Sequence, residues 1–161
     1  VFANAYNFPV LGFRYFNSFG PRQDPDGPYA AVIPLFVKAI MNNTSAFING
    51  DGGQTRDFTY VENAVQVNVK GMLSTNAEAK NKVYNVAVGK NYSVNFLYDV
   101  IKKYLNSTIE ATHREPREGD IRNSLADISL AKNLLGYEPT MNFESGLVKT
   151  IEYFKDLYSQ N

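Results

Sequence analysis

Residues 10–16, with the sequence VLGFRYF, constrain the fold of this chain more than any other segment. The segment is apolar and aromatic, Pro9 precedes it, and an Asn-Ser-Phe-Gly-Pro turn follows it, so it is predicted to be a strand. Before Pro9, residues 1–6 have helical spacing. A helix, a short loop and an apolar strand form half of a βαβ unit, whose strands usually lie inside a parallel sheet. The sequence therefore predicts an α/β fold.

Further helices and strands are expected along the chain. Ser93 is a good N-cap for a helix that runs to about residue 105, and Ser129 is expected to cap a short helix that ends at Gly136. The other expected elements are helices at 29–41 and 143–158, a strand at 83–88 and an extended segment at 108–112. The helix after residue 60 is predicted to bury one face, formed by Val61, Ala64, Val65, Asn68, Val69 and Met72.

Composition excludes several classes of site. Lys+Arg and Asp+Glu both total 16, so the chain has no net charge that would attract nucleic acid or an anionic membrane. It has no cysteine and a single histidine, His113, which excludes thiolate and multi-His metal centres. The most apolar run is interrupted by Pro34 and Lys38 and is too short to cross a bilayer. We therefore expect no metal, no nucleic-acid partner, no membrane insertion and a cytoplasmic location.

Two segments are candidates for binding an anion. The turn at residues 50–53 is rich in glycine, which lets backbone approach a ligand, and Arg56 beyond it could clamp an anionic oxygen. The same pattern also suits an ordinary tight turn followed by a surface ion pair between Arg56 and Asp57. At residues 114–127, three arginines alternate with carboxylates, which predicts either phosphate donors or a solvated charged loop. Both alternatives stay open from the residues alone.

Four segments together resemble a known family. Residues 14–34, 48–65, 84–94 and 116–139, in this order and spacing, resemble the C-terminal half of extended short-chain dehydrogenase/reductase enzymes that act on nucleotide sugars. Within that family they are most similar to UDP-N-acetylglucosamine 4-epimerases. The resemblance implies that residues 1–161 are a C-terminal substrate-binding portion, in which 1–20 and about 80–90 add strands to a Rossmann sheet and the rest forms a small α/β lobe.

The resemblance also implies a set of contacts to a UDP-sugar. Arg56 and Arg117 would bind the diphosphate, and Asp120 would meet the ribose hydroxyls. Phe47 would keep an aromatic face for uracil at a position where relatives often carry Tyr. Ser124 is small and would leave room for an N-acetyl group that a bulky residue would exclude. The other positions implied to contact the UDP-sugar are Asn17, Ala31, Val32 and Asn49.

The implied cofactor is NAD, with Tyr15 and Phe16 at its nicotinamide end. Its Gly-rich fingerprint does not occur in this sequence, and the catalytic Tyr-x-x-x-Lys is expected upstream of Val1. Tyr98 and Lys102 match that spacing outside the motif's context. For the intact enzyme, the family implies oxidation of the sugar at C4 by NAD, rotation of the 4-keto sugar and return of the hydride. We expect this chain alone to be inactive, and a homodimer is one option for the full-length protein.

Other functions stay open. Within the enzyme class they are UDP-glucose 4-epimerase, UDP-glucuronate epimerase or decarboxylase, and nucleotide-sugar dehydratase. Outside it, the chain could be a truncated module that binds a nucleotide sugar without chemistry. The favoured hypothesis is a UDP-GlcNAc/UDP-GalNAc 4-epimerase in polysaccharide precursor synthesis.

Overall fold

The computed structural model describes residues 2–26 and 31–159. It has a mixed α/β fold, which confirms the predicted class. The start of the helix expected at residue 29 lies outside the described residues. In chain order the elements are α1 (Phe2–Tyr6), β1 (Leu11–Tyr15), β2 (Ser18–Phe19), α2 (Val32–Met41), β3 (Phe47–Asn49), β4 (Thr55–Arg56), β5 (Thr59–Tyr60), α3 (Val61–Leu73), η1 (Ala77–Ala79), β6 (Lys82–Val86), β7 (Tyr92–Ser93), α4 (Val94–Tyr104), β8 (Thr112–Arg114), α5 (Ser129–Leu135) and α6 (Phe143–Ser159).

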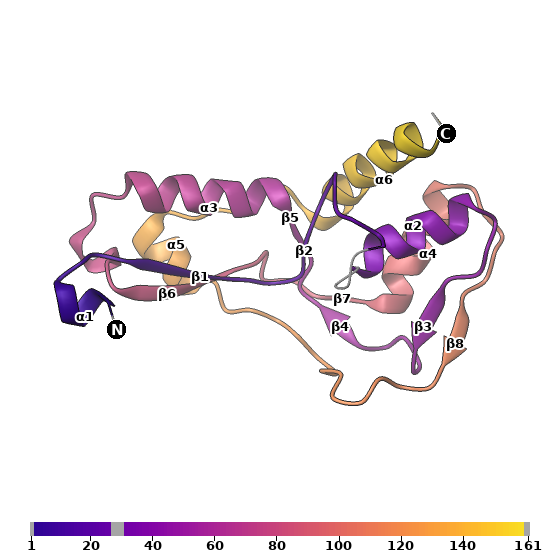
Figure 1. Ribbon diagram of the computed structural model, residues 1–161, viewed down its shortest axis with the longest axis horizontal. Coiled ribbons are helices and arrows are strands. Elements are labelled where there is room, and N and C mark those ends of the chain that lie inside the picture. Colours follow the sequence, from indigo (N-terminus) through magenta and orange to yellow (C-terminus); the bar gives the residue numbers. More distant parts are fainter. Residues whose placement is uncertain (1, 27–30, 160–161) are drawn as a thin grey trace.

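The strands pair across long distances in the sequence. β1 and β6 run parallel, in a register from Leu11 opposite Lys82 to Tyr15 opposite Val86. β2 pairs with β5 and β3 with β8, also in parallel, whereas β4 and β7 are antiparallel. The molecule is elongated, with β1, β6, α3 and α5 at one end and α2, α4, β3, β4, β7 and β8 at the other (Figure 1). Within the described residues, no helix has the length and apolar character needed to cross a bilayer.

Each end of the molecule has its own hydrophobic core. At the end that holds β1 and β6, the core is built around the fully buried rings of Tyr84 and Tyr137. At the other end, α2, α4 and α6 pack together, and their buried side chains include Phe36, Leu97 and Ile151. Phe19 of β2 and Tyr60 of β5 also belong to this second core, so the connection from these strands to the core around β1 and β6 must be fixed by other contacts.

The buried face of α3 differs from the predicted one. Val65 and Met72 are 56% and 85% exposed, whereas Asn63 and Gly71 are buried. The Asn63 amide donates to the Met141 carbonyl at 2.7 Å and accepts from its N–H at 3.1 Å, so its polar atoms are satisfied inside. At Gly71, an added Cβ would lie 2.9 Å from the Phe13 ring. The packed face thus consists of Asn63, Ala64, Val67 and Gly71, of which the predicted face contained only Ala64.

Helix ends follow two of the three cap predictions. The Ser93 hydroxyl accepts from the Phe96 N–H at 3.1 Å, and Gly136 ends α5 with a φ of 63°, so both predictions are confirmed. The prediction for Ser129 is wrong, because Ser129 is the first residue of α5 and Ile128 occupies the N-cap position; Asp127, just before it, accepts the Ser129 N–H at 2.8 Å. The Ser129 hydroxyl and, second to it, this backbone bond lower the pKa of Asp127.

Asp57 does not form the surface ion pair with Arg56 that was one of the two sequence interpretations. Its side chain is fully buried and accepts the backbone N–H groups of Val88 at 3.0 Å and Gly89 at 2.9 Å, with Ala126 at 3.5 Å. Burial raises the pKa of Asp57, and the three backbone donors act against that shift. The carboxyl therefore joins the turn after β6, the loop before α5 and its own segment.

Replacing Asp57 by alanine should destabilise the fold. Asp57→Ala leaves two well-aligned backbone donors without a partner, so we expect a loss of about 2–4 kcal/mol in urea unfolding. The matched control is Asp99→Ala on the exposed side of α4, for which we expect a change within about 0.5 kcal/mol. Equal losses in the two variants would contradict the role given to Asp57.

Candidate functional site

A cavity of about 650 Å³ lies between the start of α2, strand β3 and the loop that follows β8. Most of the positions that the family resemblance singled out for the UDP-sugar face this one space, although they come from four separate stretches of the chain. Their roles at a ligand stay predictions. The predicted positions that line the cavity are Asn17, Ala31, Val32, Phe47, Asn49, Arg56, Arg117 and Asp120.

The first turn of α2 gives the cavity a wall suited to an anion. Ala31 is the N-cap residue, and no side chain of residues 2–26 and 31–159 caps the helix there. The first N–H groups of a helix have no partner within it, and the helix dipole makes this end positive. Val32 and Ile33 begin the helix and line the cavity, and Pro34 follows in the same turn. A helix start of this kind is a common binding site for phosphate.

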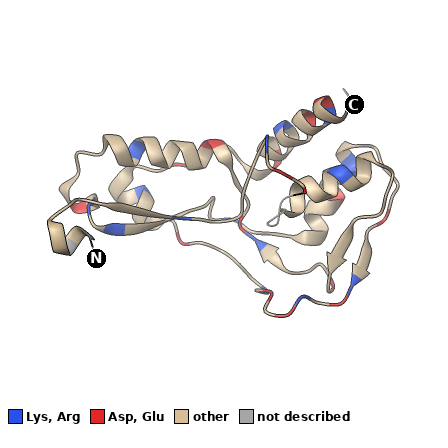
Figure 2. Ribbon diagram, in the orientation of Figure 1, with Lys and Arg blue, Asp and Glu red and all other residues tan. Residues whose placement is uncertain are grey.

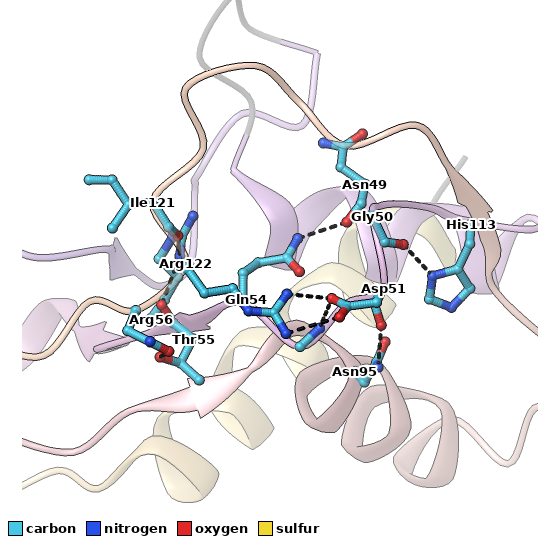
Figure 3. Close-up of polar contacts among 12 residues, drawn as sticks. Asn49, Gly50, Asp51, Gln54, Thr55, Arg56, Asn95, His113, Ile121 and Arg122 are labelled. Carbon is cyan, nitrogen blue, oxygen red and sulfur yellow. Dashed lines mark hydrogen bonds and ion pairs between the residues drawn. The ribbon is translucent and has the colours of Figure 1, made fainter.

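Two arginines of the cavity are neutralised to different degrees. Arg56 forms an ion pair with Asp120 and donates to the carbonyl oxygens of Ile121 at 2.6 Å and Thr55 at 2.8 Å, so its position is fixed (Figure 3). Arg117 is exposed, and no described residue pairs with its guanidinium group. The cavity therefore has positive charge available for a ligand, and Figure 2 shows that basic and acidic residues alternate along the loop after β8.

Strands β3 and β8 present one face to the ligand side and one to the core. In their register Phe47 lies opposite Thr112, and Asn49 lies opposite Arg114. Because side chains alternate along a strand, these four share a face, while Ile48 between them is 2% exposed in the core. The Arg114 Nε atom donates to Asn49 Oδ1 at 2.5 Å, and its guanidinium carbon lies 5.4 Å from the centre of the Phe47 ring.

Sequence reasoning missed Arg114 as an individual site residue. It placed this arginine only in a general charged segment, and the resemblance assigned it no contact. Arg114 lines the cavity together with Gln54, whose amide donates to the Asn49 carbonyl at 2.9 Å. The signal that identifies Arg114 is its place opposite Asn49, 65 residues earlier in the chain. Such a register is not readable from local sequence.

The Gly-rich turn is a tight turn, as in the plainer of the two sequence interpretations, but the ion pair that stabilises it joins Asp51 to Arg122 and not Arg56 to Asp57. Asp51 accepts from Arg122 Nη1 at 2.6 Å and Nη2 at 2.9 Å, and from the Gly53 N–H at 2.9 Å (Figure 3). Asn95 donates to the Asp51 carbonyl at 2.8 Å and lies so close that a Cβ on Gly52 would be 1.8 Å from its Oδ1 atom. Glycine is needed there for packing, and the turn's own polar groups are largely used within it.

Three predicted site residues lie outside the cavity. The Tyr15 hydroxyl donates to Asn68 Oδ1 at 3.0 Å, and Phe16 packs against the core that contains β1 and β6. Ser124 lies beside β4, where its N–H donates to the Thr55 carbonyl at 3.1 Å. Their assignments to NAD and to the N-acetyl group are not tested by this arrangement and stay predictions.

The Tyr98–Lys102 pair has structural roles. Tyr98 is 2% exposed and donates to the Ile109 carbonyl at 3.1 Å, while Lys102 pairs with Glu110. Burial raises the pKa of Tyr98, which keeps its hydroxyl protonated and leaves less of the deprotonated form that could act as a base. Across residues 2–26 and 31–159, no group of three acidic or histidine side chains could hold a metal ion.

The chain is similar to nucleotide-sugar enzymes over nearly its whole length. The family model described as GDP-mannose 4,6 dehydratase matches residues 1–150. A putative UDP-glucose 4-epimerase of Methanocaldococcus jannaschii is 35% identical over 156 residues, which cover 97% of this chain and 49% of that protein. The chain thus spans about half the length of that relative.

Solved structures give the same comparison. A UDP-glucose 4-epimerase from Thermotoga maritima, crystallised with UDP-glucose, superposes with a TM-score of 0.91 at 36% identity, covering 98% of this chain and 49% of that one. A UDP-N-acetylglucosamine 4-epimerase from Methanobrevibacter ruminantium, in complex with UDP-N-acetylmuramic acid, gives 0.89 at 41% identity, covering 97% and 49%. The fold is that of one half of a Rossmann-type epimerase.

The ion pair between Arg122 and Asp51, which closes the Gly-rich turn, should be detectable through the pKa of the Asp51 carboxyl. Hydrogen bonds from Arg122, followed by the Gly53 N–H, lower the pKa of Asp51 from 3.8 to about 2. A lowered pKa means that the stabilisation is fully present above pH 3.8 and is lost as the pH falls through about 2. In Arg122→Met, carbon-detected NMR titration should show the Asp51 pKa moving back towards 3.8. An unchanged pKa would mean that the Arg122 contact does not form in solution.

Proposed function

The chain belongs to the GDP-mannose 4,6-dehydratase family, and on that premise we propose that it forms the UDP-sugar-binding part of an NAD-dependent nucleotide-sugar 4-epimerase. The observation that carries this proposal is one cavity lined both by the start of α2, which no described side chain caps, and by Arg117, whose guanidinium group pairs with no described residue. Both favour a negatively charged group, and a diphosphate offers oxygens for each.

The rest of the cavity suits the nucleoside. Phe47 is 59% exposed at the rim and offers a ring for stacking, and Asn49 beside it offers an amide. Asp120, held by Arg56, is the carboxylate proposed to accept from the ribose hydroxyls. Arg56 then acts at the diphosphate from a position fixed by two carbonyl oxygens. These contacts bind the non-reacting part of the substrate, whose binding energy can serve to orient the sugar.

The proposed sugar is N-acetylglucosamine or its C4 epimer. Ser124 is small and pairs through its N–H with Thr55 in β4, the strand that also carries Arg56. The family resemblance supports the proposal that a bulky residue at this position would exclude the N-acetyl group. A UDP-GlcNAc/UDP-GalNAc 4-epimerase of this type would serve polysaccharide precursor synthesis. The main alternative is a UDP-glucose 4-epimerase, which is what the similar Thermotoga maritima protein is.

NAD would supply the hydride acceptor and donor for C4 of the sugar. Tyr15 and Phe16 at the carboxyl end of the parallel strand β1 are the residues of this chain proposed to lie at its nicotinamide end. The position fits, because ligands of open α/β sheets bind at the carboxyl ends of the strands, and the Tyr15 ring is half exposed there. Since Tyr98 and Lys102 are engaged elsewhere, this chain by itself would bind the substrate without epimerising it.

Loss of Arg117 should weaken nucleotide binding. For Arg117→Met we expect UDP to bind about 10- to 100-fold more weakly by isothermal titration calorimetry, since a charge-assisted hydrogen bond to phosphate is lost. The control is Arg14→Met on β1, which removes the same charge at an exposed position that does not line the cavity. It should change the affinity by less than about twofold. A wild-type chain that does not bind UDP at all would overturn the proposed function.

A bulky residue at position 124 should discriminate between sugars. For Ser124→Tyr we expect the affinity for UDP-GlcNAc to fall about tenfold or more, because the ring would occupy the space of the N-acetyl group. Affinity for UDP-glucose, measured by the same titration, should change little. Equal effects on the two sugars would remove the argument for N-acetylated substrates and favour the UDP-glucose alternative.

A further inference from the structure

We propose that Arg114 is a positioning residue that selects the nucleotide base by fixing the orientation of the Asn49 amide. The proposal rests on the proposed function, in which Phe47 and Asn49 receive the base. It adds a residue and a preference: a pyrimidine with a carbonyl oxygen at position 4, such as uracil, over one with an amino group there, such as cytosine.

The orientation of the Asn49 amide follows from what Arg114 can offer. The Nε–H of an arginine only donates hydrogen bonds, so the Asn49 atom that lies 2.5 Å from it must be the acceptor, Oδ1. The oxygen and the nitrogen of a side-chain amide point in different directions from the carbon that joins them. With Oδ1 bonded to Arg114, the Nδ2 amino group is the end left for a ligand, and no described residue accepts a hydrogen bond from it.

Several contacts hold Arg114 in place. It lies directly opposite Asn49 in the β3–β8 register, so the two side chains leave the backbone on the same face. Its guanidinium group lies 5.4 Å from the Phe47 ring centre, within the range of a cation–π contact. No carboxylate of the described chain pairs with Arg114, and the side-chain oxygen Oδ1 of Asn49 is its polar partner. Arg114 thus contacts both residues that are proposed to bind the base, Phe47 and Asn49.

A fixed amino group distinguishes the two pyrimidines at one position. Uracil presents the O4 acceptor where cytosine presents the N4 amino donor. The Asn49 amino group can donate to O4, whereas it would face the cytosine amino group donor to donor. A free asparagine could rotate its amide and accept from cytosine instead, but that rotation would break the bond to Arg114 and leave two donors facing each other. The Arg114 contact therefore turns an adaptable amide into a selective one.

The test compares UDP and CDP, which share the diphosphate and the ribose. Their dissociation constants are measured by isothermal titration calorimetry for the wild-type chain, Arg114→Met, Arg122→Met and Asn49→Asp. Arg122→Met is the matched control: it removes one arginine from the same loop, where that side chain binds Asp51, and leaves the Arg114–Asn49 contact intact. Circular dichroism of each variant confirms that it is folded.

We expect the wild-type chain to bind UDP about tenfold or more tightly than CDP, and Arg114→Met to bring the two within about threefold. Arg122→Met should keep the wild-type ratio whatever its effect on both affinities. Asn49→Asp offers only acceptors, so its ratio should move in favour of CDP; this variant tests the same amide without depending on Arg114→Met being folded.

The outcomes separate this inference from the proposed function. If Arg114→Met weakens UDP and CDP equally and keeps their ratio, Arg114 acts as a general charge, and the inference is overturned while nucleotide binding stands. A wild-type chain that binds UDP and CDP with equal affinity also overturns it. Binding of neither nucleotide would instead overturn the proposed function on which the inference rests.

Discussion

The buried carboxyl of Asp57 is the contact on which the arrangement of the site depends. Two separate cores stabilise the two ends of the molecule, and Asp57 lies in the segment that connects them: Phe58 belongs to one core, while Val86, Ala87 and Ala126 belong to the other. Its bonds to the backbone after β6 and before α5 hold that connection. Because neighbouring residues in extended backbone point to opposite sides, burying Asp57 directs Arg56 outward to the cavity. A buried polar group here fixes the position of an exposed one.

Some arginines of the site form ion pairs with carboxylates, whereas Arg117 forms none with the described residues. A chain with 16 basic and 16 acidic residues has no overall attraction for anions, so binding must come from local imbalance. Asp51 neutralises Arg122, and Asp120 neutralises Arg56. Arg117 has no such partner among the described residues, and it faces the same cavity as the uncapped start of α2. The ion pairs shape the walls, and the unpaired groups are those with electrostatic energy left for a ligand.

Sequence reasoning found those features whose cause is local. The strand at β1, the Ser93 cap and the Gly136 end of α5 depend on residues next to one another, and the structure has them as expected. It failed on the buried face of α3, because Asn63 is satisfied by the backbone of Met141, 78 residues away. The family resemblance named eight positions that the fold brings to one cavity, but it could not give the partners of each. Arg114 was overlooked for that reason.

The register of two short strands decides what the cavity presents to a base. β3 and β8 have three residues each, and a shift of one residue would send Ile48 to the ligand side and Asn49 into the core. Burial of Ile48 opposes that shift, as do the backbone bonds at both ends of the pair, from Thr112 N–H to the Ala46 carbonyl and from Gly50 N–H to the Arg114 carbonyl, each 2.8 Å. The Gly50 N–H is the first backbone donor of the Gly-rich turn. The turn thus contributes to the site through its backbone, without touching a phosphate: this N–H helps to hold the register that places Arg114 opposite Asn49.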